Sequence, residues 1–136
     1  MKFPSITFYT DRLPNDVGGR TNGPIVRIRP LYLADVGIHK HEYEHVKQFW
    51  SVGLVAAVLL ALVDLSLTLG GFAAHPLLYK FCRKYRLVCE VSAYKVQMQF
   101  ANASGARLSL DGAAQRLMSP RYDLRLFRDL AVALLR

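Results

Sequence analysis

Cysteine is scarce in this 136-residue sequence, and its placement excludes several kinds of site. The two cysteines, Cys82 and Cys89, are seven residues apart. On one helix their Cα atoms would be roughly 10 Å apart, at a rise of about 1.5 Å per residue. A disulfide requires less than about 7 Å, so we expect two free thiols in a reducing compartment. The sequence also lacks a Cys-x-x-Cys pair, which excludes zinc-ribbon and thioredoxin-like sites.

The N-terminus lacks the continuous apolar run of a signal peptide, because Pro4 and charged residues occur early. We therefore expect a cytoplasmic or virion-associated protein. Internal repeats and low-complexity tracts are absent as well. A hydrophobic content of 52% is enough for a packed core, and we expect one domain over residues 1–136.

Acidic residues are few: 10 Asp and Glu stand against 18 Lys and Arg, which gives a formal net charge of +8. The positive potential could attract nucleic acid, anionic lipid or an acidic protein. The basic residues do not form one long run, and the short group at residues 80–86 is too small for a nucleic-acid motif. We therefore do not expect nucleic-acid binding, and a solvated basic surface is the alternative.

Residues 41–45 read His-Glu-Tyr-Glu-His, which is the H-E-x-x-H pattern of zinc metallopeptidases. On a helix, positions i and i+4 share a face, so His41 and His45 can direct ring nitrogens at one ion at about 2.0–2.1 Å. Glu42 projects beside them and can take a proton from a water in the metal's open position. The alternative is a polar helix surface with two solvated histidines.

A catalytic zinc ion needs a third protein ligand from elsewhere in the chain. Position 51 is Ser51, so the third histidine of metzincins, six residues after His45, is absent. The sequence offers instead Glu90-Val-Ser-Ala93-Tyr94, which starts 45 residues after His45 on a predicted helix.

This combination, H-E-x-x-H followed by a helix with E-x-x-A, resembles thermolysin-like and other gluzincins. The resemblance implies one Zn²⁺ per chain, with His41, His45 and Glu90 as ligands and Glu42 as the catalytic base. It also implies that Ala93 is the small residue where the second helix crosses the first. Tyr94 stands where an Asp is frequent in that family.

The stretches HEYEHVKQFW and KYRLVCEVSAYKVQM also resemble very small zincin-like proteins of bacteria and phages. The resemblance covers about residues 25–50 and 77–100. It implies an α+β, mostly helical, minimal zincin-like fold with a short N-terminal β element and a two-helix zinc site. It does not cover the N-terminal 20 residues, the apolar segment or the C-terminal helix.

Hydrophobic periodicity and turn residues predict the elements around these motifs. Asp35 is the expected N-cap of the first metal helix. We expect strands at 3–10 and 25–29, a loop at 11–24, and helices at 34–50, 75–86, 87–101, 109–118 and 121–136. The last helix is amphipathic and belongs to a C-terminal segment that begins at residue 119.

Residues 25–29 alternate apolar and basic side chains and end at Pro30, which favours an edge strand. Gluzincins bind peptides along an edge strand ahead of the metal helix, so the resemblance implies that this segment binds substrate by strand addition. Covering the core is its alternative role. The residues concerned are Ile25, Val26, Arg27, Ile28 and Arg29.

Several polar residues are candidates for roles around the metal. Glu44 and Tyr94 are candidates to support the ligands, with a solvated helix position as the alternative for Glu44. His75, Tyr85 and Tyr122 are candidates to stabilise an oxyanion, and nothing in the sequence selects among them.

Residues 51–74 form an apolar segment with one charge, Asp64. The length could span a bilayer, but the unbroken run is short and a central carboxylate is costly in lipid. We expect a buried helix or helical hairpin, an apolar insertion in the domain.

These observations predict a zinc-dependent peptidase that acts on a peptide or protein substrate. One alternative is a phage structural or assembly protein that keeps the metal site and binds a protein partner. A second alternative is a membrane-embedded zinc peptidase, and it rests on residues 51–74 alone.

Overall fold

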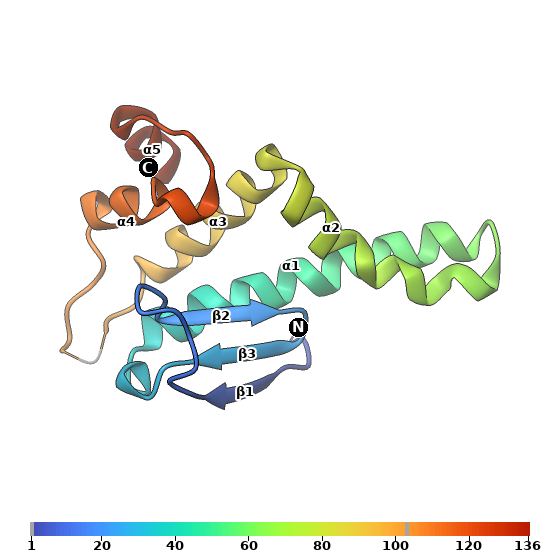
Figure 1. Ribbon diagram of the computed structural model, residues 1–136, viewed down its shortest axis with the longest axis horizontal. Helices are drawn as coiled ribbons and strands as arrows, with labels where there is room; N and C mark the ends of the chain where they lie inside the picture. Colours follow the sequence, from blue (N-terminus) through green and yellow to red (C-terminus); the bar gives the residue numbers. More distant parts are fainter. Residues whose placement is uncertain (1, 103) are drawn as a thin grey trace.

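The N-terminal part of the chain folds into a three-stranded sheet, and most of the rest is helical (Figure 1). The computed structural model describes residues 2–102 and 104–136. The sheet contains β1 (Ile6–Tyr9), β2 (Gly19–Asn22) and β3 (Ile25–Ile28) in the order β1-β3-β2. β3 is parallel to β1 and antiparallel to β2. The fold is α+β and mostly helical, as the sequence predicts.

β3 is the central strand, so the expected edge position of residues 25–29 is wrong. β1 and β2 occupy its two sides along its whole length. Residues 19–22 were expected in a loop, because Gly-Arg-Thr-Asn shows no apolar alternation and lies in a Gly- and Asn-rich stretch. Gly23, with φ +61°, provides the tight turn from β2 into β3. β2 is therefore the edge strand that the sequence did not reveal.

The longest element, α1 (Val36–Ala61), begins as predicted and ends later. A side-chain oxygen of Asp35 accepts a hydrogen bond from the backbone N–H of Ile38 at 3.0 Å, so Asp35 is the N-cap. The helix runs on into the apolar segment, which contains no helix-ending residue before position 61. The N-terminal half of α1 covers one face of the sheet. The buried residues of this contact are Val26, Ile28, Ile38 and Val46.

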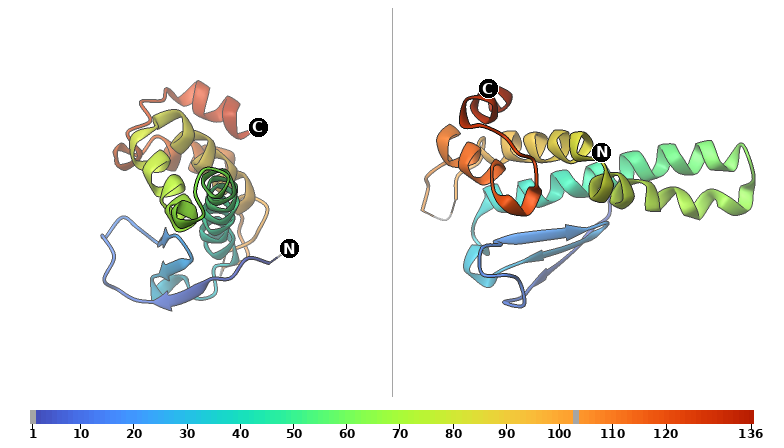
Figure 2. Two further views of the ribbon diagram at one scale, coloured as in Figure 1. Left: turned by 90° about the vertical axis from the view of Figure 1, so that its right-hand side faces the viewer. Right: turned by 45° about the horizontal axis from the view of Figure 1, so that its top comes forward.

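The C-terminal half of α1 pairs with a 3-10 helix, η2 (Leu65–Ala73), in a hairpin that projects from the rest of the molecule (Figure 2). The two legs touch closely. A Cβ atom added to Gly71 would lie 2.3 Å from the backbone nitrogen of Ala57. A Cβ added to Gly53 would lie 2.7 Å from the ring of Phe72. Glycines therefore allow the legs to approach each other.

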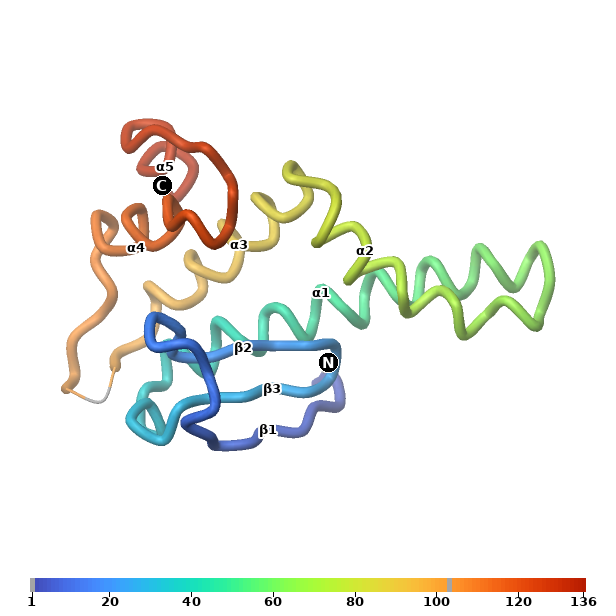
Figure 3. The backbone as a smooth tube through the Cα atoms, viewed as in Figure 1, coloured from blue at the N-terminus to red at the C-terminus, as the bar shows by residue number. Residues whose placement is uncertain are grey.

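The expected burial of residues 51–74 is wrong. The hairpin extends beyond the other elements (Figure 3), and Leu62 and Leu65 are each 79% exposed. Burial fails because each leg can cover only one side of the other, and in the described part of the chain the outer side chains of both legs stay exposed. Among the described residues, no helix is both long enough and apolar enough to cross a membrane.

Two helices return the chain along α1: α2 (Ala74–Phe81) and α3 (Arg83–Gln97). The break between them is at Cys82, which is extended with φ −102° and ψ 101°, and not after residue 86 as predicted. Cys82 and Cys89 are both free thiols, as expected.

The C-terminal part forms a second core against α3. It contains α4 (Leu110–Leu117), which Ser109 caps, and α5 (Arg128–Leu135). The predicted helix over 121–136 is correct only from residue 128, because Asp123 and Arg125 adopt positive φ values of 47° and 53°. A short 3-10 helix, η3 (Pro120–Tyr122), precedes them, as η1 (Pro30–Tyr32) precedes α1. Tyr122 packs with Tyr94, Leu117 and Leu124.

Candidate metal centre

His41, His45 and Glu90 meet between α1 and α3. His41 and His45 share a face of α1 because they are one turn apart, and Glu90 comes from the helix that packs across it. The Nε2 atoms of the histidines are 3.3 Å apart. Oε1 of Glu90 is 3.4 Å from Nε2 of His45, and Oε2 of Glu90 is 3.9 Å from Nε2 of His41. The sequence-predicted ligand set therefore lies together.

These separations fit one metal ion. Two atoms that each bind an ion at about 2.1 Å with a tetrahedral angle lie about 3.4 Å apart. The carboxylate of Glu90 is 1% exposed, and its Oε2 has no hydrogen-bond partner among the described residues. A buried carboxylate oxygen without a partner is costly, and a cation would satisfy it. The cluster could hold a metal ion, and its two imidazoles and one carboxylate are a donor set that zinc accepts.

The electrostatic environment keeps His41 in the form that binds metals. Burial lowers the pKa of the His41 imidazole well below its usual value, and the neighbouring His45 and the positive Arg121 lower it further. A metal ligand must be the neutral imidazole, with a free lone pair on nitrogen. His41 therefore needs no proton release at neutral pH before it can coordinate an ion.

Gln48 fixes the orientation of His45. Nδ1 of His45 lies 2.9 Å from Oε1 of Gln48, and Nε2 of Gln48 donates to the backbone carbonyl of Cys89 at 3.1 Å. An N–H on Nδ1 leaves the lone pair on Nε2, which faces Glu90. Gln48 thus links α1 to α3 at the level of the candidate ligands.

Glu42 lies beside the three ligands and contacts the edge strand. Its carboxylate is buried, and Oε2 accepts a hydrogen bond from the hydroxyl of Thr21 at 2.7 Å. A Cβ added to Gly19 would lie 2.6 Å from Oε1 of Glu42, so the glycine makes room for the carboxylate. Burial raises the pKa of the Glu42 carboxyl, and nearby His45 and Thr21 partly oppose this. A raised pKa suits a group that accepts and returns a proton near neutral pH.

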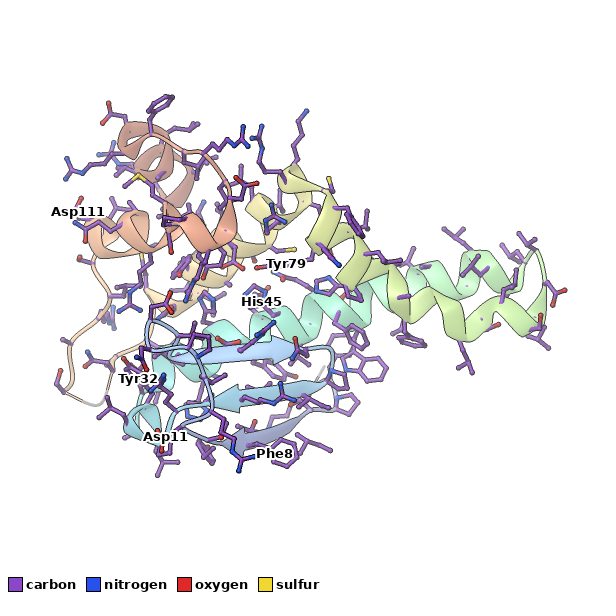
Figure 4. All side chains as sticks on the ribbon, in the orientation of Figure 1. Phe8, Asp11, Tyr32, His45, Tyr79 and Asp111 are labelled. Carbon is purple, nitrogen blue, oxygen red and sulfur yellow. The ribbon has the colours of Figure 1, made fainter. Side chains whose placement is uncertain are left out.

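Tyr79 of α2 is a site residue that the sequence did not single out. Its hydroxyl donates a hydrogen bond to Oε1 of Glu90, and its ring lies 6.1 Å from the ring of His45. Figure 4 labels His45 and Tyr79 in the region between α1 and α2. Burial and the Glu90 carboxylate raise the pKa of Tyr79, so it remains a hydrogen-bond donor. No motif in the sequence marks Tyr79, because its contact with Glu90 depends on how α2 packs against α3.

Of the two residues predicted to support the ligands, Tyr94 contacts His41 and Glu44 has its partners elsewhere. Tyr94 packs its ring edge-on against His41, with centroids 4.6 Å apart. Its hydroxyl is 3.0 Å from that of Tyr122, which also accepts from Arg121 at 2.7 Å. Glu44 points to other partners, namely Ser92 and Lys47.

His75 and Tyr85 pair with each other at 2.6 Å, and of the two only His75 lines the cavity. Burial lowers the pKa of His75 to about 4. Tyr122 lines the cavity as well, and so does Arg121, which the sequence did not single out.

The candidate metal centre opens into a cavity of ≈ 1210 Å³. Residues 18–24, which include all of β2, line one wall, and side chains from α2 and η3 line others. None of residues 25–29 lines this cavity, so the segment expected to bind substrate lies away from the metal centre. The edge strand beside the cavity is β2.

Comparison with known proteins adds no further identification. The chain matches no protein-family model, no curated protein and no solved structure. The site must therefore be interpreted from its own geometry.

Proposed function

We propose that this protein is a zinc-dependent peptidase of the gluzincin type. The observation that carries the proposal is the convergence of His41, His45 and Glu90 within 4.8 Å, with the buried Glu42 carboxylate beside them. A zinc ion on these three residues would supply a Lewis acid for the scissile carbonyl and lower the pKa of a catalytic water.

Glu42 is the proton-transfer group of the proposed reaction. It takes a proton from the attacking water and gives it to the departing amine as the carbon–nitrogen bond breaks. The Thr21 hydroxyl holds the carboxylate in place, at 2.7 Å from Oε2. The raised pKa of Glu42 makes it a stronger base than an exposed carboxylate.

The substrate would bind along β2. Among the described residues β2 pairs with β3 alone and lies at the cavity wall, so its outer edge has backbone N–H and C=O groups for an added strand. This replaces the role expected of residues 25–29, whose strand has neighbours on both sides. Arg121 supplies hydrogen-bond donors to the same cavity for a developing oxyanion, and Tyr79 would do so by turning its single hydroxyl proton from Glu90 to the substrate.

The ligand count favours turnover over a purely structural metal. Structural zinc sites usually fill all four positions with protein ligands, whereas catalytic sites keep one open. Here three side chains converge, and the buried Glu42 lines the same cavity and lies close enough to His45 and Glu90 for their charges to act on it. A structural or assembly protein would have no need of a buried base next to an open cavity.

Metal analysis and one conservative variant test the proposal. We expect about one zinc per chain, lost in His41→Ala and Glu90→Ala and retained in His39→Ala, which removes a histidine outside the cluster. Glu42→Gln should retain zinc while cleavage of an unstructured protein falls by about 10² or more. Wild-type protein that holds zinc but cleaves nothing across a broad peptide library would refute the peptidase and favour the structural alternative.

A further inference from the structure

The projecting hairpin is the largest feature that the proposed function does not use. Between Val52 and Val63 every residue is apolar. The exposed side chains here are Leu54, Val55, Val58 and Leu59 on α1, and Leu62 and Val63 in the turn that follows it. Leu65, Leu67 and Leu69 continue the exposed surface on η2. Together they expose on the order of 1,000 Å², above the roughly 300–600 Å² of the largest patch on a typical monomer.

We propose that this hairpin inserts into the surface of an anionic lipid bilayer and anchors the protein there without crossing it. Both ends of the hairpin join the same folded unit, since α1 carries His41 and α3 carries Glu90. The hairpin must therefore enter and leave the bilayer on one side. This anchoring does not depend on the metal or on peptidase activity.

The length of the hairpin matches one leaflet. Residues 51–61 of α1 rise about 16 Å along the helix axis, at about 1.5 Å per residue. This is half of a hydrocarbon core about 30 Å thick. The backbone of both legs is helical and bonded internally, as lipid requires. The hydroxyl of Thr68 also donates to the carbonyl of Leu65 at 2.7 Å, so it does not enter lipid unpaired.

Lipid fits the hairpin better than a second copy of the chain. The exposed side chains at positions 54–59 of α1 spread over about 140° of the helix, at about 100° per residue, and those of the following turn and η2 extend the surface further. A packed helix buries a stripe of about 100°, so a partner helix would cover part of this surface and leave the rest in water. Lipid covers all of it at once.

The charge distribution also favours an anionic membrane. Residues 48–79 contain no Lys or Arg, although the chain carries a net charge of +8. The exposed Lys80 near the end of α2, and Arg83 and Lys84 at the start of α3, are the first basic residues after the hairpin. Such charges are attracted to anionic headgroups, and they would oppose the close approach of a second positive chain.

Aromatic rings lie at the base of the hairpin. The ring of Trp50 is 5.5 Å from that of Phe72, and the two join the first leg to the second. Nε1 of Trp50 donates to the carbonyl of Pro4 at 2.9 Å in the folded unit. Tryptophan with an apolar side and a bonded N–H is typical of the membrane–water interface.

Asp64, at the tip, is the single charge on the hairpin. It caps η2 by accepting from the N–H of Ser66 at 2.8 Å. A carboxylate can take up a proton when it enters an apolar medium, so the tip opposes insertion without preventing it. Asp64→Asn keeps a capping side chain and removes the charge, and should strengthen membrane binding.

Vesicle flotation of the full-length protein tests the proposal. We expect wild type to float with vesicles of equal parts phosphatidylglycerol and phosphatidylcholine, and much less with phosphatidylcholine alone. Leu62→Gln with Leu65→Gln and Leu69→Gln should reduce binding at least tenfold. Leu31→Gln is the matched control, since Leu31 is 81% exposed but lies outside the hairpin. It should bind as wild type does.

Three results would overturn the proposal. If the wild-type protein does not float with the anionic vesicles, lipid is not what covers the hairpin. Equal flotation of the triple variant shows that another surface makes the contact. A dimer in lipid-free solution that the triple variant abolishes, without vesicle binding, assigns the hairpin to a second copy of the chain.

Discussion

The hydroxyl of Thr21 lies 2.7 Å from Oε2 of Glu42 and joins the edge strand of the sheet to the metal helix. The two residues are 21 positions apart in sequence and belong to different layers of the fold. The contact ties the proposed base to the strand along which the substrate would bind. It also stabilises the ionised carboxylate, since a hydrogen bond to a charged acceptor favours the charged form.

We predict that Thr21→Val shifts the low-pH limb of the kcat/KM profile to higher pH. The Thr21 hydrogen bond lowers the pKa of Glu42, so its removal raises that pKa. Less of the base is then ionised at a given pH, and activity on the acidic side should fall by about tenfold, the scale of a hydrogen bond to a charged group. At high pH the variant should approach wild type, because Glu42 is ionised in both.

Thr21→Ser is the control for the shift, because it keeps the hydroxyl and should keep the wild-type profile. Zinc content should be unchanged in both variants. An equal loss at every pH in Thr21→Val would show that Thr21 acts on the position of β2 and not on the pKa of Glu42.

Tyr79→Phe should separate substrate activation from metal binding. Tyr79 lines the cavity and its hydroxyl donates to Glu90, so Tyr79→Phe removes a hydrogen bond to a candidate ligand without removing a ligand. We expect kcat to fall by about 10² if the hydroxyl stabilises an oxyanion, with zinc stoichiometry unchanged. Tyr85→Phe is the matched control, since the Tyr85 hydroxyl bonds His75 outside the ligand set. A loss of zinc with unchanged activity per bound zinc would assign Tyr79 to holding Glu90 only.

The two candidate histidine ligands were predictable because their signal is local. His41 and His45 are one helical turn apart, and any helix places them on one face. Glu90 required a comparison with a family pattern, because its position depends on how α3 crosses α1. Tyr79 and Thr21 were not predictable, since their contacts with Glu90 and Glu42 depend on how α2 and β2 pack.

The fold shows the same division between local and non-local information. Caps such as Asp35 and Ser109 are local, and both begin helices where the sequence predicts them. Residues 25–29 were wrongly predicted to be an edge strand, because the true edge strand at residues 19–22 was not recognised. Residues 19–22 lack the apolar alternation that indicates a strand, although their backbone pairs with β3. The helix over 121–136 was overextended because periodicity does not report the left-handed conformations of Asp123 and Arg125.

Stability of the metal-depleted protein should fall as the pH drops through the histidine range. Burial lowers the pKa of His75 to about 4, with His45 as the second cause, whereas an unfolded histidine titrates near about 6.5. The unfolded chain therefore binds a proton first, and stability is lost progressively from about pH 6.5 down to about pH 4. The full difference corresponds to about 3 kcal/mol.

Urea unfolding in the presence of a chelator at several pH values measures this loss. His75→Asn keeps a polar group near Tyr85 and removes the titration, so its stability should vary less between pH 7 and pH 4. His41 contributes in the same direction as His75, and Glu42, whose pKa is raised, in the opposite one. The comparison of His75→Asn with wild type isolates the His75 contribution. Parallel pH curves for the two proteins would show that His75 is not buried as a neutral imidazole.

Gly70 and Gly71 provide a matched pair for the close packing of the hairpin. A Cβ on Gly71 would lie 2.3 Å from the nitrogen and 2.5 Å from the Cα of Ala57, and both are backbone atoms that cannot rotate away. Gly71→Ala must therefore push the legs apart, at a cost of about 1–3 kcal/mol.

A Cβ on Gly70 would meet only a methyl group of Leu60 at 3.8 Å, so Gly70→Ala should be neutral or slightly stabilising. We expect Gly71→Ala to lower the melting temperature by several degrees and to make the hairpin sensitive to protease. Zinc binding should stay intact, because His41 and His45 lie on the other half of α1 and Glu90 lies on α3. Equal effects of the two substitutions would mean that the legs are separated in solution, and the hairpin would then be a pair of independent apolar segments.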